Sequence, residues 1–67
     1  MSNRELVFED LKNPLLLFGE HDQNIRFLEK EFYVSIYPKA NTVKIEGQEK
    51  NVDLVEKALN YLFEESQ

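Results

Sequence analysis

The sequence contains no cysteine and no long apolar run. Without cysteine the chain forms no disulfide and offers no thiolate for metal binding or redox chemistry, which fits a reducing compartment. The longest apolar run spans residues 15–18, whereas a membrane span needs about 20 apolar residues. The first residues also lack the apolar region of a signal peptide. We therefore expect a cytoplasmic protein without a membrane partner.

Positive charge is scarce as well. Eight Lys and Arg residues stand against thirteen Asp and Glu residues, a net charge of −5. Proteins that hold nucleic acid by bulk electrostatics carry the opposite sign, so nucleic-acid binding by this chain has to be local or weak. The charged residues after Gly47 are Glu49, Asp53, Glu56, Glu64 and Glu65 against Lys50 and Lys57. We expect this end to face solvent or a basic partner.

The length and the apolar content predict one small folded domain over residues 1–67. A chain of this size buries only about 60% of the surface that it exposes when unfolded, too little to divide between two cores. Its hydrophobic content of 42%, with five Phe and three Tyr, is sufficient for one compact core.

The first half of the chain predicts a strand and two helices. Leu6 and Phe8 alternate with Val7, which indicates a strand over residues 4–9. Asn13-Pro14 and Gly19 are typical of the two ends of a helix, here over residues 13–18. A second helix over residues 22–32 follows from an apolar stripe with spacings of three and four residues. The residues of that stripe are Ile25, Leu28 and Phe32.

The second half predicts an antiparallel hairpin and a long helix. Residues 33–37 and 42–46 both alternate, so Val34 and Ile36 share one face with Val43 and Ile45. Pro38 is expected to end the first of these strands, because proline cannot donate to a ladder. The spacing of Val52, Val55, Leu59 and Leu62 predicts a helix over residues 48–63. The predicted class is α+β, with a three-stranded antiparallel sheet that carries three helices on one face.

The predicted order, β-α-α-β-β-α with a glycine loop between the first two helices, is that of a type I KH domain. Phe18-Gly19 is followed three residues later by Asp22-x-Asn24, then by a strand that ends in glycine and a Val-x-x-x-x-x-Ala helix. In these features the chain resembles the N-terminal KH-like region of PhoH-like (phosphate starvation-inducible) P-loop ATPases. The similarity covers nearly the whole chain, through residues 17–29, 34–36, 41–47 and 52–59.

The resemblance implies an accessory module that presents RNA to an ATPase motor or packs between its subunits. The Gly-x-x-x-x-Gly-Lys-Ser/Thr loop that binds nucleotide phosphates is absent from this sequence. The chain is therefore expected to be a domain excised from a longer ATPase, with no catalysis and no cofactor of its own. ATP and Mg would belong to the missing ATPase domain. The resemblance implies three kinds of partner, which are that ATPase domain, RNA, and a second copy of the chain through the parent protein.

The loop between the first two helices is the implied nucleic-acid site. A Gly-x-x-Gly loop lets backbone amides approach a nucleic-acid backbone, and this chain keeps Gly19 but has Asp22 in place of the second glycine. Glu20 and Asp22 would repel phosphates. The candidate nucleic-acid residues are Gly19, Glu20, His21, Asp22, Arg26, Lys30, Lys39 and Lys44, with Lys12 also near the expected groove. A modest basic strip is expected from five cations, Lys12, Arg26, Lys30, Lys39 and Lys44.

Several of these residues have a plainer interpretation. Gly19 is favoured at a helix C-terminus for its backbone freedom, and Asp22 is expected to cap the second helix instead of reading a base together with Asn24. His21 could sense pH or bind a metal, but its sequence context indicates an exposed turn residue. Neighbouring carboxylates such as Glu29 and Glu31 are interpreted as a solvated face and not as an acid and base pair.

The aromatic residues outside the apolar stripes support a second hypothesis. The candidate protein contacts are Tyr33, Tyr37, Tyr61 and Phe63, with Phe27 in the same class. Aromatic residues on a sheet stack on bases in some RNA-binding proteins and fill subunit contacts in others. One hypothesis is therefore weak binding of single-stranded RNA, and the other is an interaction or oligomerisation module of the ATPase. A free-standing protein with its own regulatory partner is a third interpretation.

Overall fold

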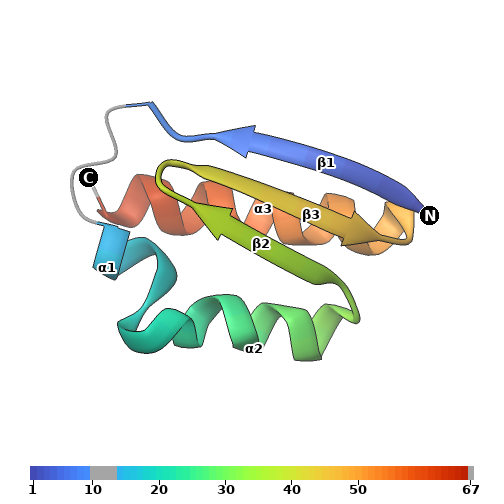
Figure 1. The fold of residues 1–67 in the computed structure, drawn as a ribbon, viewed down its shortest axis with the longest axis horizontal. Helices are drawn as coiled ribbons and strands as arrows, with labels where there is room; N and C mark the ends of the chain where they lie inside the picture. The colour runs from blue at the N-terminus through green and yellow to red at the C-terminus, as the bar shows by residue number, and fades with distance from the viewer. Residues whose placement is uncertain (10–13, 67) are drawn as a thin grey trace.

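The computed structural model describes residues 1–9 and 14–66 of the 67-residue chain. It is an α+β fold built on a three-stranded antiparallel sheet (Figure 1). The elements in chain order are β1 (Ser2–Val7), α1 (Pro14–Phe18), a 3₁₀ turn η1 (Glu20–Asp22), α2 (Gln23–Phe32), β2 (Ser35–Lys39), β3 (Thr42–Gly47) and α3 (Glu49–Ser66).

The sheet has the strand order β1-β3-β2, which makes β3 the central strand. Ile45 of β3 lies opposite Ile36 of β2 on one side and Arg4 of β1 on the other. The predicted hairpin of β2 and β3 is confirmed, and Ala40 turns it with a positive φ of 55°. Both outer strands leave one backbone edge without a strand partner among the described residues.

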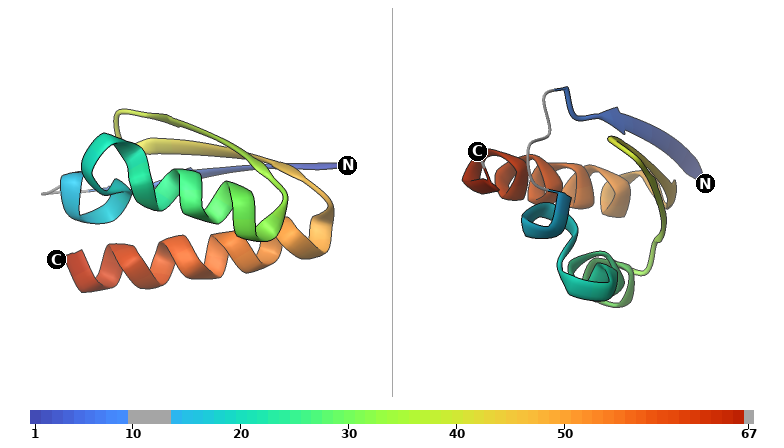
Figure 2. Two further views of the ribbon diagram at one scale, coloured as in Figure 1. Left: turned by 90° about the horizontal axis from the view of Figure 1, so that it is seen from below. Right: turned by 60° about the vertical axis from the view of Figure 1, so that its left-hand side comes forward.

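The core lies between one face of the sheet and the helices. Inward residues alternate along the strands, as the sequence predicts, and α3 adds a fully buried stripe. The buried hydrophobic residues are Phe8, Leu17, Phe18, Ile25, Leu28, Val34, Ile36, Val43, Ile45, Val52, Val55 and Leu59. Figure 2 shows α2 and α3 side by side beneath the sheet.

The expectation of three helices on one sheet face holds for α2 and α3 but needs correction for α1. The backbone of α3 runs beside β1 and β3, and that of α2 runs beside β2. In contrast, the five-residue α1 lies beside α3 and α2 and beside no described strand. Its Leu17 is fully buried, so α1 closes one end of the helical layer (Figure 1).

Two strands are displaced from their predicted ranges. The first strand covers residues 2–7 instead of 4–9, and the second covers 35–39 instead of 33–37. Tyr33 is not in a strand: it ends α2 in a left-handed conformation with φ 53°, and its N–H donates to the carbonyl of Glu29. Pro38 does not end β2, because an edge strand accepts a proline whose nitrogen faces away from the ladder.

The remaining differences are at the helix ends. The helices predicted from 22 and 48 begin at Gln23 and Glu49, and α3 continues to Ser66 instead of 63. Asn13, the predicted start of the first helix, lies outside the described residues, as does Lys12. Gly47 does end β3. A Cβ at Gly47 would lie 2.8 Å from Cγ1 of Val34, so glycine allows these two backbones to approach.

Candidate nucleic-acid interface and helical groove

The loop between α1 and α2 is held by left-handed backbone at three of its four residues. Gly19 has φ 83°, His21 φ 56° and Asp22 φ 58°. The N–H of Gly19 donates to the carbonyl of Leu15 at 2.8 Å, which confirms Gly19 as the residue that ends α1. A Cβ there would meet Cγ of Gln23 at 2.7 Å. The glycine is therefore required by the turn itself.

Asp22 does not cap α2 with its side chain, and that prediction is wrong. Asp22 occupies the N-cap position, but its carboxylate makes no capping hydrogen bond to the amides of α2, all of which are described. A capping residue normally has an extended backbone, whereas Asp22 has φ 58° and ψ 31°. Its own N–H donates to the carbonyl of Gly19 at 3.1 Å, which closes the 3₁₀ turn.

Asn24 takes a structural role that the sequence did not indicate. Its Nδ2 donates to the carbonyl of Leu17 at 3.2 Å, so the side chain of α2 satisfies one of the last carbonyls of α1. The same amide group would be needed to read a base edge. The helical register holds one signal for this role. Asn24 lies four residues before the buried Leu28, so both side chains fall on the side of α2 that faces α1 and α3.

The outward side of the loop is acidic. Glu20 and His21 are exposed over 78% and 90% of their side chains, which confirms His21 as an exposed turn residue. Nε2 of His21 lies 3.7 Å from Oε1 of Glu20, an ion pair only when the imidazole is protonated. An open hollow lies beside them, lined by Leu15, Phe18, Gly19, His21 and Asp22.

The predicted basic strip is divided between two layers of the molecule. Arg26 and Lys30 are exposed on α2, four residues apart. Lys39 and Lys44 are exposed on the sheet face that the helices leave open, since Ile36, Val43 and Ile45 occupy the covered face. No ion pair joins any of these four cations to a residue in the described part of the chain.

The open face of the sheet combines an aromatic ring with these charges. Lys44 lies between Tyr37 of β2 and Glu5 of β1 in the register of the sheet. Tyr37 is 54% exposed, and together with Glu5, Lys39 and Lys44 it lines a shallow hollow beside the hairpin turn. Tyr33, in contrast, is 85% exposed at the end of α2 and does not share this face.

An apolar groove lies between α2 and α3. Leu28, Ala58 and Leu62 line it together with Asn24, and two aromatic rings border it. These rings belong to Phe27 and Tyr61, which are 61% and 63% exposed. Exposure of both rings agrees with their position outside the predicted apolar stripes.

Phe63 does not belong to this exposed group, and the prediction that it faces outward is wrong. Its ring lies 5.0 Å from that of Phe8, centroid to centroid, with a tilt of 37° between the planes. Phe8 is buried directly after β1, and Phe63 of α3 is partly buried and packs against the core. The sequence placed Phe63 off the main stripe of α3 correctly, but only the position of β1 decides that this side is covered.

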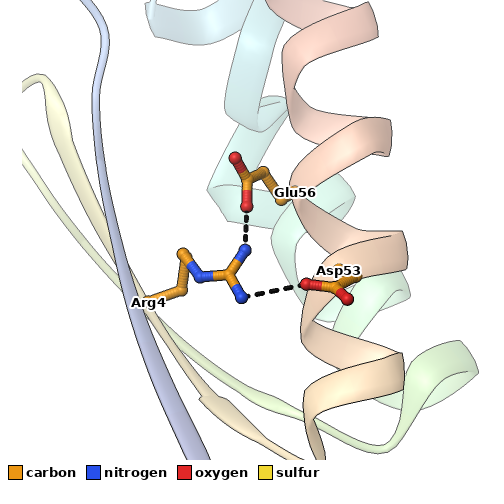
Figure 3. Close-up of polar contacts among 3 residues, drawn as sticks. All are labelled: Arg4, Asp53 and Glu56. Carbon is orange, nitrogen blue, oxygen red and sulfur yellow. Dashed lines mark hydrogen bonds and ion pairs between the residues drawn. The ribbon is translucent and has the colours of Figure 1, made fainter.

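Two ion pairs of Arg4 join β1 to α3 (Figure 3). Arg4 donates from Nη1 to Glu56 and from Nη2 to Oδ1 of Asp53, the second at 2.9 Å. Both hydrogen bonds raise the pKa of Arg4, and the one to Glu56 has the larger effect. Sequence reasoning missed this contact, although Asp53 and Glu56 are three residues apart and therefore share one side of a helix.

The described residues contain no group of three or more His, Cys, Asp or Glu side chains that could hold a metal ion. No helix in the described part of the chain is long and apolar enough to cross a membrane.

No protein-family model, no curated protein and no solved structure matches this chain.

Proposed function

We propose that this chain is a non-catalytic, KH-like accessory domain of a PhoH-like ATPase that binds single-stranded RNA weakly. The observation that carries the proposal is the backbone of the loop from Gly19 to Asp22. Asp22 stands where a KH loop has its second glycine, and it adopts a φ of 58°, a conformation that glycine favours. Gly19 and Asp22, at the two ends of the loop, thus both have a positive φ, which glycine adopts most easily.

The surroundings of the loop support the same proposal. The element order is β-α-α-β-β-α, with the loop exposed between α1 and α2. Arg26 and Lys30 follow the loop on α2 and supply positive charge that the acidic Glu20 and Asp22 lack. Binding then depends on few phosphates, so we expect micromolar or weaker affinity that collapses as salt rises.

An NMR titration tests this proposal. Amide shifts are followed while short mixed-sequence single-stranded RNA is added, first at low and then at physiological salt. We expect shifts from Gly19 to Arg26 and at Lys30, which fade as salt rises. The double variant Arg26→Gln/Lys30→Gln should lose them, whereas Lys50→Gln/Lys57→Gln, which removes two exposed cations from α3, should keep them. Tight, salt-insensitive binding or equal losses in both variants would contradict the proposal.

Asp22→Gly offers a gain-of-function test. The substitution restores both loop glycines, keeps a backbone that glycine adopts freely, and removes one negative charge beside the expected phosphate path. RNA affinity should rise, and the shifts should remain centred on the loop. Asp22→Asn removes the same charge without the glycine, so it separates the effect of charge from that of the backbone. Unchanged RNA affinity in both variants would show that this loop does not contact the RNA.

The groove between α2 and α3 favours a second function, docking to the ATPase itself. Phe27 and Tyr61 expose most of their rings beside the apolar floor of Leu28, Ala58 and Leu62, and such a patch is typical of a protein contact. Titration with the isolated ATPase domain of a PhoH-like protein tests this function. Phe27→Ser/Tyr61→Ser should abolish binding, while Tyr33→Ser, which removes an exposed ring outside the groove, should not.

A further inference from the structure

The two edges of the sheet differ in what their backbones offer to a partner. On β2 the N–H of Ile36 points away from β3, because it donates to the carboxylate of Glu29 at 2.8 Å. Pro38, two residues on, has no N–H, and the N–H of Val34 donates to the carbonyl of Glu29 at 3.3 Å. Every outward N–H from Val34 to Pro38 is thus occupied or missing. Such blocking prevents a further strand from adding to an edge.

The edge of β1 has no comparable protection. The N–H of Phe8 donates to the carbonyl of Asn41 at 2.8 Å, so Phe8 faces the central hairpin. In an antiparallel ladder the residues alternate, which turns the N–H and C=O groups of Asn3, Glu5 and Val7 outward. None of these groups has a hydrogen-bond partner within residues 1–9 and 14–66. Figures 1 and 2 show β1 at the border of the molecule with no element beside its outer edge.

The side of α3 that faces β1 is acidic. Asp53 and Glu56 face β1, because both hold Arg4 (Figure 3). Glu49 lies four residues before Asp53, and Glu64 lies eight residues after Glu56, so both fall on the same side of the helix. We call Glu49, Asp53, Glu56 and Glu64 the acidic stripe. Arg4 is the only cation that pairs with it within the described chain.

We propose that β1 binds an extended basic peptide segment as a fourth, antiparallel strand. Its backbone would pair with Asn3, Glu5 and Val7, and its alternate Lys or Arg side chains would lie over the acidic stripe. The lengths agree: six residues of β1 extend over about 20 Å, and Glu49 to Glu64 extend over about 22 Å. This surface is separate from the loop and from the groove, so the inference goes beyond the proposed function.

Charge decides in favour of a basic segment over a second copy of this chain. Two copies paired through β1 around a two-fold axis would bring their acidic stripes together, and like charges in such a contact oppose binding. A basic strand instead places cations every second residue, about 6.6 Å apart. The stripe has acids at spacings of three and four residues over its first two turns, about 4.5–6 Å along the axis. Lys and Arg side chains are long and flexible enough to reach the acids despite this difference in spacing.

A synthetic peptide of four Lys alternating with three Thr, acetylated and amidated at its ends, is the probe. In the antiparallel register its Thr residues form the backbone pairs with β1, and its Lys side chains point to the stripe. NMR titration should shift the amides of Asn3, Glu5 and Val7. A peptide that is N-methylated at the Thr residues keeps every charge but loses the paired N–H groups, so its affinity should fall about tenfold or more.

Variants of the protein separate the two parts of the site. Glu5→Pro removes one outward N–H, as Pro38 does naturally on β2, while Glu5→Gln keeps it; only the proline should abolish the shifts. Glu49→Gln/Glu64→Gln should weaken binding severalfold at low salt and little at high salt. Glu20→Gln/Glu31→Gln removes the same charge from residues outside the stripe and should change little.

Three results would overturn the proposal. The N-methylated peptide could bind as well as its parent, in which case charge alone holds it. The amides of Asn3, Glu5 and Val7 could remain unshifted at saturating peptide. Sedimentation could reveal a dimer that Glu5→Pro dissociates, which would make a second copy the occupant. If Glu5→Pro failed to fold, the comparison of the two peptides on the natural chain would still decide.

Discussion

The carboxylate of Glu29 accepts a hydrogen bond of 2.8 Å from the backbone N–H of Ile36. This contact joins α2 to the outer edge of β2. Ile36 and Pro38 face that edge of the strand, and because proline has no N–H, only the N–H of Ile36 is available there. One glutamate thus anchors a helix to the sheet and prevents the addition of a strand there.

Replacement of Glu29 tests this double role. We expect Glu29→Ala to lower the free energy of unfolding by about 1 kcal/mol, because the Ile36 amide loses its acceptor in a partly buried site. Urea unfolding measures the change. Glu31→Ala, an exposed neighbour on α2, is the control and should stay within about 0.5 kcal/mol of the natural chain. Equal effects of the two substitutions would show that the contact contributes nothing.

The ion pairs of Arg4 should make part of the stability depend on salt. Arg4→Gln loses its contacts with Asp53 and Glu56, so its urea midpoint should fall at low salt, and the deficit should shrink as salt screens the charges. Arg26→Gln removes a cation that has no ion pair within the described chain and should leave the midpoint unchanged. A deficit for Arg4→Gln that does not depend on salt would assign its effect to packing.

Gly19→Ala and Asp22→Gly, at the two ends of the loop, should have different effects on the stability of the domain. Gly19→Ala places a Cβ 2.7 Å from Cγ of Gln23 at a φ of 83°, and we expect a loss of about 1–2 kcal/mol. Asp22→Gly relieves the left-handed aspartate and should leave stability unchanged or raise it by up to about 1 kcal/mol. Thermal unfolding of the two variants measures both effects. A large loss for Asp22→Gly would indicate a stabilising role of the carboxylate that its geometry does not suggest.

The core of this small domain should tolerate little loss of volume. Leu59 is fully buried, and Leu59→Ala should lower the free energy of unfolding by about 3 kcal/mol. A 67-residue domain has only roughly 3–10 kcal/mol in total, so the variant should be partly unfolded at 37 °C. Circular dichroism at increasing temperature tests this. Leu54→Ala on the exposed side of α3 should have a near-wild-type midpoint; if it does not, Leu54 belongs to the packed interior.

Hydrophobic periodicity predicted most elements, because a helix or strand that is buried on one side has apolar residues at a regular spacing. The alternation around Ile36 and Ile45 and the stripe from Val52 to Leu59 both recur as buried faces. The predictions failed at the end of a helix and where a residue's environment comes from a distant segment. Tyr33 continues an alternating pattern, yet it adopts φ 53° to end α2. Phe63 leaves the main stripe, yet the ring of Phe8, which follows β1, packs against it.

The candidate sites divide in the same way. The sequence located Gly19 as a turn residue and Phe27 and Tyr61 as outward rings, because both inferences depend on local conformation and helical register. It could not predict that Asn24 bonds to Leu17 or that Arg4 bonds to Asp53, since these pairs depend on how separate elements meet. For the same reason it placed four cations in one strip that the sheet and α2 hold in different layers.

The sequence by itself determined the α+β class, the hairpin, the buried faces and the acidic character of α3, because hydrophobic period and charge are properties of neighbouring residues. Only the tertiary structure decided that β3 is central, that β2 is blocked by Glu29 and Pro38, and that β1 is left open beside the acidic stripe. Strand order and edge exposure depend on backbone hydrogen bonds between segments far apart in the chain, and side-chain patterns do not encode these bonds directly.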